Sequence, residues 1–342
     1  MIYYAGIDVS LKSSSVAVVD DKGKLVREAK VLSEPSAVIE WFRSCGLPVE
    51  RIGLEAGPLS QWLYAAMTEA GLAVDLLETR HVRNAFKTMP VKTDRKDAHR
   101  IAELVRVGWY RPVHCKSMDA QETRTLLAAR KLVDRKLHDV ETSLRGLLRG
   151  YGLKVGRTTP TRFADRIKEL VGGHAMLQVI AASLLAVHQV LLREFKSFEK
   201  RVRIMARDSA EARLLMTTTG VGPIISLTVA AGIDDPGRFK TSKSVGAYFG
   251  LTQKKYQSGE TDITGRISKA GDAEVRTALF QAAHIMLTKP VRNSALRTWA
   301  LRLAKRVGMS KAKVALARRL AVVMHRMLVD GTPFNPAAGA AA

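Results

Sequence analysis

Two carboxylates, Asp94 and Asp97, stand three residues apart in the stretch 91–102, which reads V-K-T-D-R-K-D-A-H-R-I-A. Thr93 before them is a typical helix N-cap, and an apolar stripe at helical spacing follows, so both carboxylates should project from one face of the first helical turn. The pair is surrounded by the basic residues Lys87, Lys92, Arg95, Lys96 and Arg100. Acids that converge in cationic surroundings can hold a divalent metal against a phosphate, although a solvated first turn would carry the same pair.

The elements that must position these acids begin with a sheet. Three short strands joined by turns are predicted first, and alternating helices and strands follow. The predicted strands are 3–8, 15–19, 24–32, 51–55 and 73–77, and the predicted helices are 36–45 and 59–70. An antiparallel meander that continues as alternating helix and strand implies a mixed α/β sheet with helices on its faces. This is the ribonuclease H-like arrangement, in which the first strand is central and the fourth lies beside it.

Two further acids end predicted strands: Asp8 ends the first, in G-I-D-V-S, and Glu55 ends the fourth, in G-L-E-A-G. Ends of neighbouring strands meet at the sheet edge where open α/β sheets bind ligands. A helix packed on this sheet could bring Asp94 and Asp97 to the same edge. Four carboxylates at one point repel one another unless cations lie between them, so the pattern predicts two Mg²⁺ ions that bridge a phosphate. Either strand-end acid alone would be only a capped strand end.

The charge of the chain points to a polyanionic partner. Among 342 residues, 55 Lys and Arg stand against 32 Asp and Glu, a formal net charge of +23. Eleven of the basic residues, and no acidic one, lie between Lys289 and Arg326. Since the sequence shows no lipid-anchor motif, nucleic acid is the partner that this balance favours.

The sequence gives no sign of export or membrane insertion. The two cysteines, Cys45 and Cys115, have neither zinc-site nor disulfide-framework spacing, which is typical of a protein in reducing cytoplasm. The N-terminus lacks the pattern of a signal peptide. Residues 175–192 carry no charge, but polar residues interrupt them and their periodicity continues into a charged segment. We therefore predict a packed helix there, and no membrane span.

Two long helices with heptad spacing are predicted in the middle of the chain, from 120 to 150 and from about 175 to 208. Their apolar seams are Leu126, Val133, Val140 and Leu147 in the first, and Leu177, Leu184, Leu191, Phe198 and Met205 in the second. The glycine-containing region 150–162 must be a loop. The two seams fit an intramolecular hairpin or a coiled coil between subunits, and we favour the dimer contact because nothing else in this segment could cover them.

The C-terminal third contains two short apolar helices within 211–233 that flank G-V-G, with glycines at Gly220 and Gly222. Such a helix-hairpin-helix lets backbone amides approach a phosphate, although an ordinary glycine turn is the alternative. An extended polar segment with Y-Q-S-G follows, and Asp272 is the predicted N-cap of the next helix. The tail 333–342, rich in Pro and Ala, is predicted to be disordered.

Taken together, these motifs closely resemble the DEDD transposases of the insertion-sequence one-hundred-ten family, whose relatives include the Piv-type DNA invertases. The resemblance rests on the D…E…D-x-x-D order, G-V-G-P, G-A-Y-F-G-L-T, Y-Q-S-G and G-R-I-S-K-A-G-D-A-E-V-R, and it runs from Tyr4 to about Phe334. It implies a RuvC-like catalytic domain at 1–115, coiled-coil dimerisation helices at 116–208, and a mainly helical transposase domain at 209–332 with a serine nucleophile.

Matched position by position, the family's metal-binding tetrad is Asp8, Glu55, Asp94 and Asp97. The nucleophile is Ser258 in Y-Q-S-G; by residue type alone Ser258 would be a turn serine, and the phenol of Tyr256 competes with it. The residues expected to contact nucleic acid are Lys92, Arg95, Lys96, Gly220, Gly222, Arg266, Lys269, Arg276, Arg318 and Arg319.

The resemblance implies a Mg²⁺-dependent transposase guided by a non-coding bridge RNA from the same element, which pairs with donor and target DNA. Strands would be cut and rejoined through a phosphoserine by a dimer of dimers, in bacterial or archaeal cytoplasm close to the nucleoid. Three alternatives stay open: a junction nuclease without a covalent step, a Piv-like invertase without a guide, and an actin-like ATPase. The last would need a second glycine-rich phosphate strand, which the sequence lacks.

Overall fold

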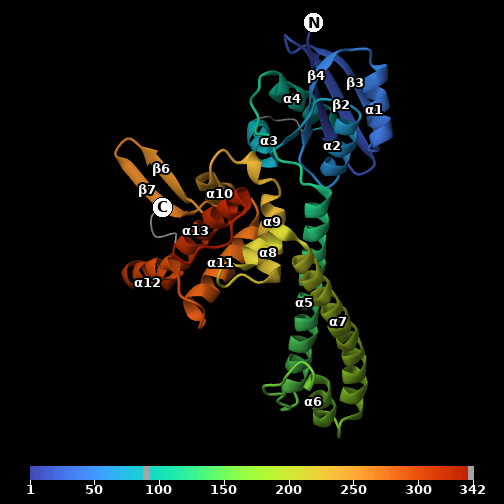
Figure 1. Cartoon of the computed structure of the whole chain (residues 1–342). Helices are drawn as coiled ribbons and strands as arrows, with labels where there is room; N and C mark the ends of the chain where they lie inside the picture. Colours follow the sequence, from blue (N-terminus) through green and yellow to red (C-terminus); the bar gives the residue numbers. More distant parts are fainter. Residues whose placement is uncertain (88–92, 338–342) are drawn as a thin grey trace. The chain divides into compact units, whose positions relative to one another are not determined.

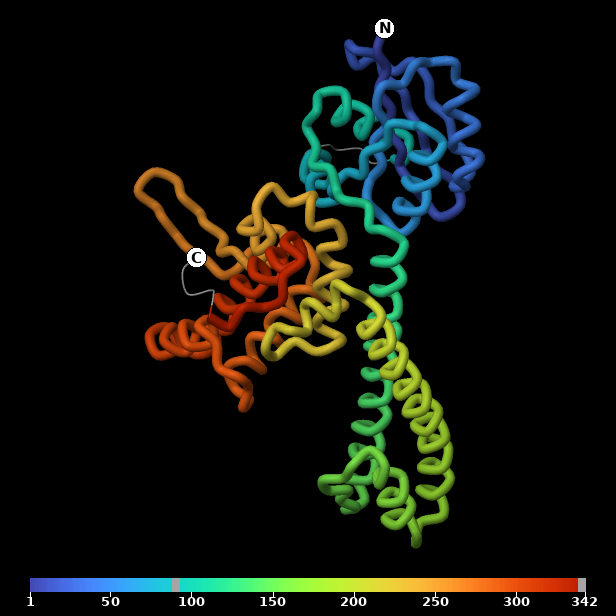
Figure 2. The backbone as a smooth tube through the Cα atoms, in the orientation of Figure 1, coloured from blue at the N-terminus to red at the C-terminus, as the bar shows by residue number. Residues whose placement is uncertain are grey.

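A computed structural model describes residues 1–87 and 93–337 (Figure 1). The chain divides into two compact units, Met1–Lys116 and Ser117–Ala342. Figure 2 follows the backbone through both units.

The first unit is built on a five-stranded mixed sheet with the strand order β3-β2-β1-β4-β5. The strands are β1 (Tyr3–Val9), β2 (Ser13–Asp20), β3 (Leu25–Leu32), β4 (Val49–Glu55) and β5 (Val74–Leu77). Strand β1 is central; it pairs antiparallel with β2 and parallel with β4. The predicted mixed α/β sheet is therefore confirmed.

Four helices cover the sheet: α1 (Pro35–Ser44), α2 (Ser60–Glu69), α3 (Thr79–Phe86) and α4 (Asp94–Arg106). Figure 1 shows α3 and α4 on one face and α1 on the other. Helix α4 lies directly on β1, because a Cβ added to Gly6 would sit 2.2 Å from Ala98 O and 2.3 Å from Ala102 N. Only glycine at that position allows the helix backbone to come so close to the strand.

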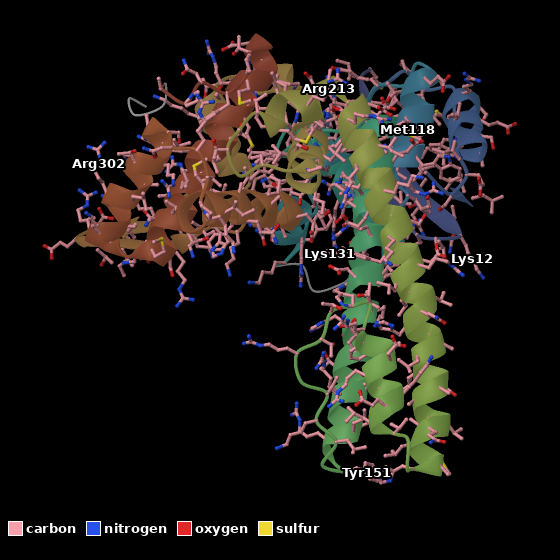
Figure 3. The ribbon with its side chains drawn as sticks, turned by 60° about the horizontal axis from the view of Figure 1, so that its bottom comes forward. Lys12, Met118, Lys131, Tyr151, Arg213 and Arg302 are labelled. Atoms are coloured by element: carbon pink, nitrogen blue, oxygen red, sulfur yellow. The ribbon has the colours of Figure 1, made fainter. Side chains whose placement is uncertain are left out.

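The second unit begins with a long helical stalk. Helices α5 (Met118–Arg149) and α7 (Ala175–Asp208) pack along each other, with α6 (Phe163–Leu170) between them in sequence. In Figure 3, Met118 marks the start of α5 and Tyr151 the far end of the stalk. A buried histidine ties the two helices, since His188 Nε2 lies 3.0 Å from Glu141 Oε1. The intramolecular hairpin, one of the two arrangements that the heptads allowed, is thus present.

Our prediction that residues 175–192 form a packed helix is only partly right. The helix is present, but 22% of its most apolar 18-residue window is buried. Its exposed apolar side chains form a stripe, which we call the α7 stripe: Met176, Val179, Ile180, Val187 and Val190. The reason is geometric: α5 and α6 cover only the opposite side of α7, at Leu177, Ala181 and Leu185.

By length and composition alone, α7 would qualify as a membrane-spanning helix. Its own contacts favour a role in packing against protein. His188 is buried against Glu141, and the helix continues into a charged half that holds Arg130 of α5 through Glu199. A polar pair and an ion pair of this kind are costly to place in hydrocarbon.

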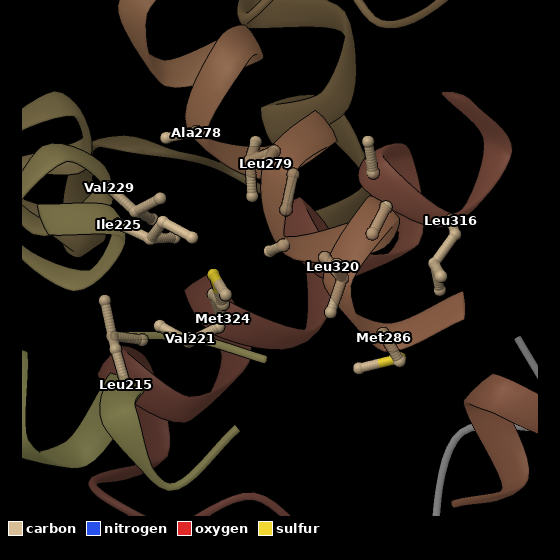
Figure 4. Close-up of a cluster of buried hydrophobic side chains, with 14 of the residues drawn as sticks. Leu215, Val221, Ile225, Val229, Ala278, Leu279, Met286, Leu316, Leu320 and Met324 are labelled. Carbon is tan, nitrogen blue, oxygen red and sulfur yellow. The ribbon is translucent and has the colours of Figure 1, made fainter. Parts of the chain in front are cut away.

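The rest of the second unit is a helical body around one large core. Its elements are α8 (Ala210–Met216), α9 (Pro223–Ile233), η1 (Pro236–Arg238), α10 (Ser242–Tyr248), β6 (Gln253–Ser258), β7 (Thr261–Ile267), α11 (Ala273–Thr288), α12 (Ala295–Val307) and α13 (Met309–Asp330). Figure 4 shows the core, where Leu279 and Met286 of α11 lie near Leu320 and Met324 of α13. Strands β6 and β7 form a separate two-stranded ribbon.

The predicted disordered tail is wrong for residues 333–337. Phe334 is buried in the core of the helical body, and its backbone N–H donates to Thr217 Oγ1 at 2.9 Å. Ala295 N donates to Pro336 O at 2.8 Å. The buried Phe334 ring and these two backbone hydrogen bonds together hold the segment on the core, which composition alone does not reveal. Residues 338–342 lie outside the described part of the chain.

Candidate active site

The two strand-end acids of the first unit share one face of the sheet. Gly6 and Gly53 both face α4, since a Cβ on Gly53 would lie 2.5 Å from Val105 Cγ2. Side chains alternate along a strand, so Asp8 and Glu55, each two residues further on, also point to the α4 face. Ile7 pairs with Leu54 in the parallel ladder, so the two acids occupy neighbouring positions one step beyond that pair.

Helix α4 starts at the same edge of the sheet. Its N-cap is Thr93, whose Oγ1 accepts from Lys96 N at 3.3 Å, as the sequence predicted. The other end of the helix lies near the β2–β3 turn, where a Cβ on Gly23 would sit 2.9 Å from Glu103 Oε1. The helix therefore runs opposite to β1, and its first turn, which carries Asp94 and Asp97, lies toward the end of β1 that carries Asp8.

The two helix acids have different surroundings. Asp97 is only 6% exposed, and its Oδ1 accepts from Arg100 Nη1 at 3.0 Å. Asp94 is exposed and lines a shallow cavity with Ser15 and Lys30. Since Ser15 pairs with Asp8 in the β1–β2 ladder, this cavity adjoins the rung of Asp8. The four predicted ligands thus come from three elements that meet at one end of the sheet, and we call this end the acid edge.

The acid edge fits a divalent metal in its chemistry and its placement, but its carboxylates are not drawn together. Within residues 1–87 and 93–337, no three Asp, Glu, His or Cys side chains lie close enough to hold an ion. Carboxylate oxygens are the ligands that Mg²⁺ prefers. Arg100 Nη1 lies 3.0 Å from Asp97 Oδ1 and balances the charge of that carboxylate. Asp8, Glu55, Asp94 and Asp97 are the residues that would hold the metal.

The basic residues beside the acid edge are not equivalent. Arg95 forms an ion pair with Glu28 of β3, although most of its side chain is exposed. Lys96 is exposed, and Lys92 lies outside the described residues. Of the predicted nucleic-acid contacts in this cluster, Lys96 is exposed and forms no ion pair with the described residues.

Ser258 stands at the tip of the β6–β7 ribbon. It ends β6 and pairs with Thr261, so Gly259 and Glu260 form a two-residue turn. Gly259 has φ +55°, a value that glycine adopts readily. Every residue of β6 is exposed, and Ser258 Oγ forms no hydrogen bond with the part of the chain that the structure describes. The hydroxyl is accessible to a large substrate, and among the described residues it is not hydrogen-bonded to a general base.

The two ends of the ribbon cross closely where they enter the helical body. A Cβ on Gly250 would lie 2.2 Å from Ala270 O, and one on Gly271 would lie 2.1 Å from Tyr248 O. Arg276 Nη1 donates to three carbonyls at this crossing, those of Phe249 (3.2 Å), Ala270 (2.6 Å) and Gly271 (3.0 Å). The sequence suggested Arg276 as a phosphate contact, but the structure gives it a structural role that sequence reasoning missed.

Asp272 joins the end of the ribbon to the stalk. It caps α11, as predicted, by accepting from Glu274 N at 2.8 Å and Val275 N at 3.2 Å, and it also forms an ion pair with Arg124 of α5. Burial by itself would raise the pKa of Asp272, but the charge and hydrogen bond of Arg124 and the two amides lower it overall. Lys131 Nζ, 2.8 Å from Glu274 Oε1, adds a second link. The ribbon is therefore exposed at its tip and fixed at its base.

Packing, as well as the predicted phosphate binding, explains the glycines of the G-V-G turn. Gly220 has φ +84°, and a Cβ there would lie 3.2 Å from Ala282 O of α11. Gly222, by contrast, has open space around it and precedes Pro223 at the start of α9. Of the two predicted phosphate contacts, Gly222 is the one whose surroundings leave room for a ligand.

In the basic C-terminal region too, one predicted contact has a packing role and another is exposed. Arg319 stacks on Trp299, with its guanidinium carbon 3.9 Å from the ring centroid, and burial lowers the pKa of its guanidinium. Arg318 is exposed. Further exposed basic residues on and around α12 and α13 are Lys289, Arg292, Arg302, Lys305, Arg306 and Lys311. Arg319 therefore helps to hold α13 against α12, whereas Arg318 is available to a polyanion.

Replacing Arg302 and Arg318 with Glu should weaken nucleic-acid binding and flatten its salt dependence. Each lost phosphate contact should reduce the slope of log K against log salt by roughly 0.7 to 0.9. The measurement is a binding titration at several salt concentrations. The double variant Lys22→Glu with Lys24→Glu, at the exposed β2–β3 turn of the first unit, is the control for the same change in net charge. A slope equal to that of the control variant would mean that these arginines are only a solvated helix face.

Two family models match the chain. A model described as a transposase and named for the DEDD domain of IS110-type elements matches residues 5–153, and the model of the IS116/IS110/IS902 transposase family matches residues 212–299. Together they span more than half of the sequence. With the acid edge on a mixed sheet, these matches define the protein as a DNA transposase, an enzyme with a DEDD domain. It belongs to the IS116/IS110/IS902 family of insertion-sequence transposases.

Individual relatives agree over nearly the full length. The transposase for insertion sequence element IS1111A of Coxiella burnetii is 27% identical over 94% of this chain and 88% of its own length. A probable family 20 transposase of Pseudomonas aeruginosa is 26% identical over 97% of this chain and 98% of its own length. The transposase for element IS1328 of Yersinia enterocolitica is 23% identical over 83% and 85%, respectively. The similarity thus includes both units.

Proposed function

We propose that this transposase is an RNA-guided, Mg²⁺-dependent recombinase that cuts and rejoins donor and target DNA through a phosphoserine intermediate. The observation that carries the metal-dependent part is the common face of Asp8, Glu55 and the first turn of α4. The covalent part is supported by the exposed position of Ser258 at the ribbon tip. The guide and the role of Ser258 come from the family resemblance.

In the proposed reaction, Ser258 Oγ attacks the phosphorus of a phosphodiester, and the P–O3′ bond breaks. A phosphoserine ester forms, and the proton of the serine hydroxyl ends on the released 3′-hydroxyl. The 3′-hydroxyl of the exchanged strand then attacks the phosphoserine and restores the serine. Because each ester replaces another, the exchange needs no ATP. Mg²⁺ bound at the acid edge would polarise the phosphate and stabilise the charge that develops on it.

The basic residues near the ribbon would neutralise the phosphate during attack. Arg266 and Lys269 are exposed on the second leg of the ribbon and at its end. Arg276 is not assigned to this task, since its guanidinium already donates to three carbonyls. Ser258 Oγ forms no hydrogen bond with the described residues, and we propose that a phosphate bound to Mg²⁺ is an electrophile strong enough for attack by this hydroxyl.

The guide RNA is the part of the proposal with a direct test. The protein should be purified from cells that carry its native element, and the bound RNA should be sequenced. We expect a non-coding RNA encoded by the element itself, with segments complementary to donor and target. Recombination by a preparation free of RNA would reject the guide and support an invertase-like enzyme that reads DNA unaided.

A second copy of this chain is the proposed partner of the α7 stripe, which would make the stalk a dimer contact within a dimer of dimers. Val179→Glu combined with Val187→Glu should therefore shift the protein to a smaller species in sedimentation velocity and reduce recombination, because two charges would be buried at an apolar contact. Gln178→Glu combined with Gln189→Glu, both exposed on the same helix but outside the stripe, is the matched control. A wild-type protein that sediments as a monomer would contradict this assignment.

The rival function is a metal-dependent junction nuclease with the same acid edge and no covalent step. Its favouring observation is that Ser258 Oγ forms no hydrogen bond with a base among the described residues. A DEDD domain by itself supplies metal-dependent hydrolysis, so a nuclease would not need a catalytic residue from the β6–β7 ribbon. Substitution of Ser258 distinguishes the two functions, because only the covalent mechanism needs its hydroxyl.

A further inference from the structure

The β6–β7 ribbon displays a large apolar pair beside Ser258. Tyr256 and Ile263 face each other directly across the two strands and are 65% and 60% exposed. Ser258 follows Tyr256 by two residues, so the two side chains lie on one face of β6. Ile263 and Thr261, their partners in the ladder, complete the same face of β7. The predicted nucleophile thus stands at the end of an exposed apolar surface, which we call the Tyr256 face.

The opposite face of the ribbon is polar. Lys255 Nζ lies 3.2 Å from Asp262 Oδ2, and Gln257 and Thr264 belong to the same side. The Tyr256 face has a cation of its own, because Lys254 precedes Tyr256 by two residues and its Cβ lies 3.7 Å from the position of a Cβ on Gly265. The Tyr256 face therefore combines an aromatic ring, an aliphatic side chain, a cation and a serine hydroxyl. The Lys255–Asp262 ion pair belongs to the opposite face.

We propose that Tyr256 stacks on a nucleobase next to the scissile phosphate, with Ile263 as the apolar surface beneath it; this rests on the proposed role of Ser258. The partner is DNA, the substrate class of a transposase, and Lys254 would meet its phosphate. A ring two residues from Ser258 is displaced by roughly 7 Å along the strand, at about 3.3 Å per residue. That distance is about two base-pair rises of 3.4 Å, so ring and hydroxyl reach the same cleavage site.

The physical reason is the cost of leaving this pair in water. A cross-strand pair of an aromatic and a β-branched residue stabilises a ribbon, but two side chains that stay about two-thirds exposed gain little by it. An exposed aromatic ring offers a replacement surface to a base that leaves its stack. Tyr256 would then be a positioning residue, which fixes the strand so that its phosphate faces Ser258.

The test is photochemical cross-linking of full-length protein to DNA that spans an end of its own element. The protein carries the RNA that copurifies with it, and 5-iododeoxyuridine replaces one thymidine at a time near the cleavage site. Light-induced cross-links form with an aromatic ring stacked on the modified base, and mass spectrometry identifies the residue. We expect a cross-link to Tyr256 within about two nucleotides of the cleaved phosphate. The Ser258→Ala protein should give the same cross-link, because stacking does not require the covalent step.

Three variants separate stacking from a structural role. Tyr256→Phe should keep both the cross-link and cleavage, because the ring remains. Tyr256→Leu, which keeps an apolar side chain in the strand, should lose the cross-link and bind the element end at least about fivefold more weakly. Thr264→Ala, on the opposite face, should behave as the wild type.

Wild-type cross-linking at every position to residues other than Tyr256, or full cleavage and binding by Tyr256→Leu, would overturn the stacking proposal.

Neither outcome depends on whether Ser258 forms an adduct, which is measured separately. Protein that forms the Ser258 adduct without the Tyr256 cross-link would reject stacking alone. Cross-linking to Tyr256 without any Ser258 adduct would support stacking and reject the covalent mechanism.

Discussion

Ser258→Ala is expected to abolish the covalent protein–DNA adduct and to reduce recombination by roughly 10⁴-fold or more, since loss of a nucleophile removes the whole covalent route. Ser258 is exposed at a ribbon tip and its hydroxyl holds no other described group in place, so the change should cost little stability. The variant should keep its melting temperature and its affinity for nucleic acid. The measurement is trapping on nicked DNA, followed by mass spectrometry of the labelled peptide.

Tyr256→Phe is the matched control for this experiment, because it removes the competing phenol and keeps the aromatic ring. It should form the adduct as the wild type does. An adduct that maps to Tyr256, or recombination by the Ser258→Ala protein at the wild-type rate, would show that Ser258 is not the nucleophile. Cleaved DNA with free ends and no attached protein, under every trapping condition, would favour the junction nuclease.

Asp94→Asn and Asp97→Asn should each abolish strand cleavage in Mg²⁺ while nucleic-acid binding remains. Both changes remove a metal-binding charge with almost no change of volume. Asp94 is exposed, so its variant should fold as the wild type does. Asp97 is buried and forms an ion pair with Arg100, so its variant loses the charge of that pair and should melt at a lower temperature. The Asp94 variant is therefore the cleaner test, and the Asp97 variant requires a melting curve.

The control for the acid-edge variants is Asp21→Asn, in the turn at the opposite end of the sheet, where Arg106 Nη1 donates to Asp21 O. It lowers the negative charge of the same unit by the same amount and should cleave normally. Cleavage by Asp94→Asn at the wild-type rate would remove Asp94 from the metal site. Equal loss of cleavage in Asp21→Asn would mean that net charge, and not the acid edge, governs the reaction.

The strand order of the first unit could be predicted because each of its signals is local. A meander followed by alternating helix and strand places the first strand in the centre, and the alternation of side chains then sends Asp8 and Glu55 to one face. Thr93 and Asp272 were predictable as caps for the same reason, since a cap contacts amides only two or three residues away.

The sequence by itself determined the strands of the first unit, the two long helices, the position of the caps and the order of the acids, because those depend on neighbours within a few residues. Tertiary structure alone decided which polar groups are already engaged, since Arg124 meets Asp272 and Arg319 meets Trp299 only after folding. It likewise decided that Phe334 enters the core and that the α7 stripe stays exposed. Burial depends on what the rest of the chain places around a residue, and periodicity shows only that an apolar face exists.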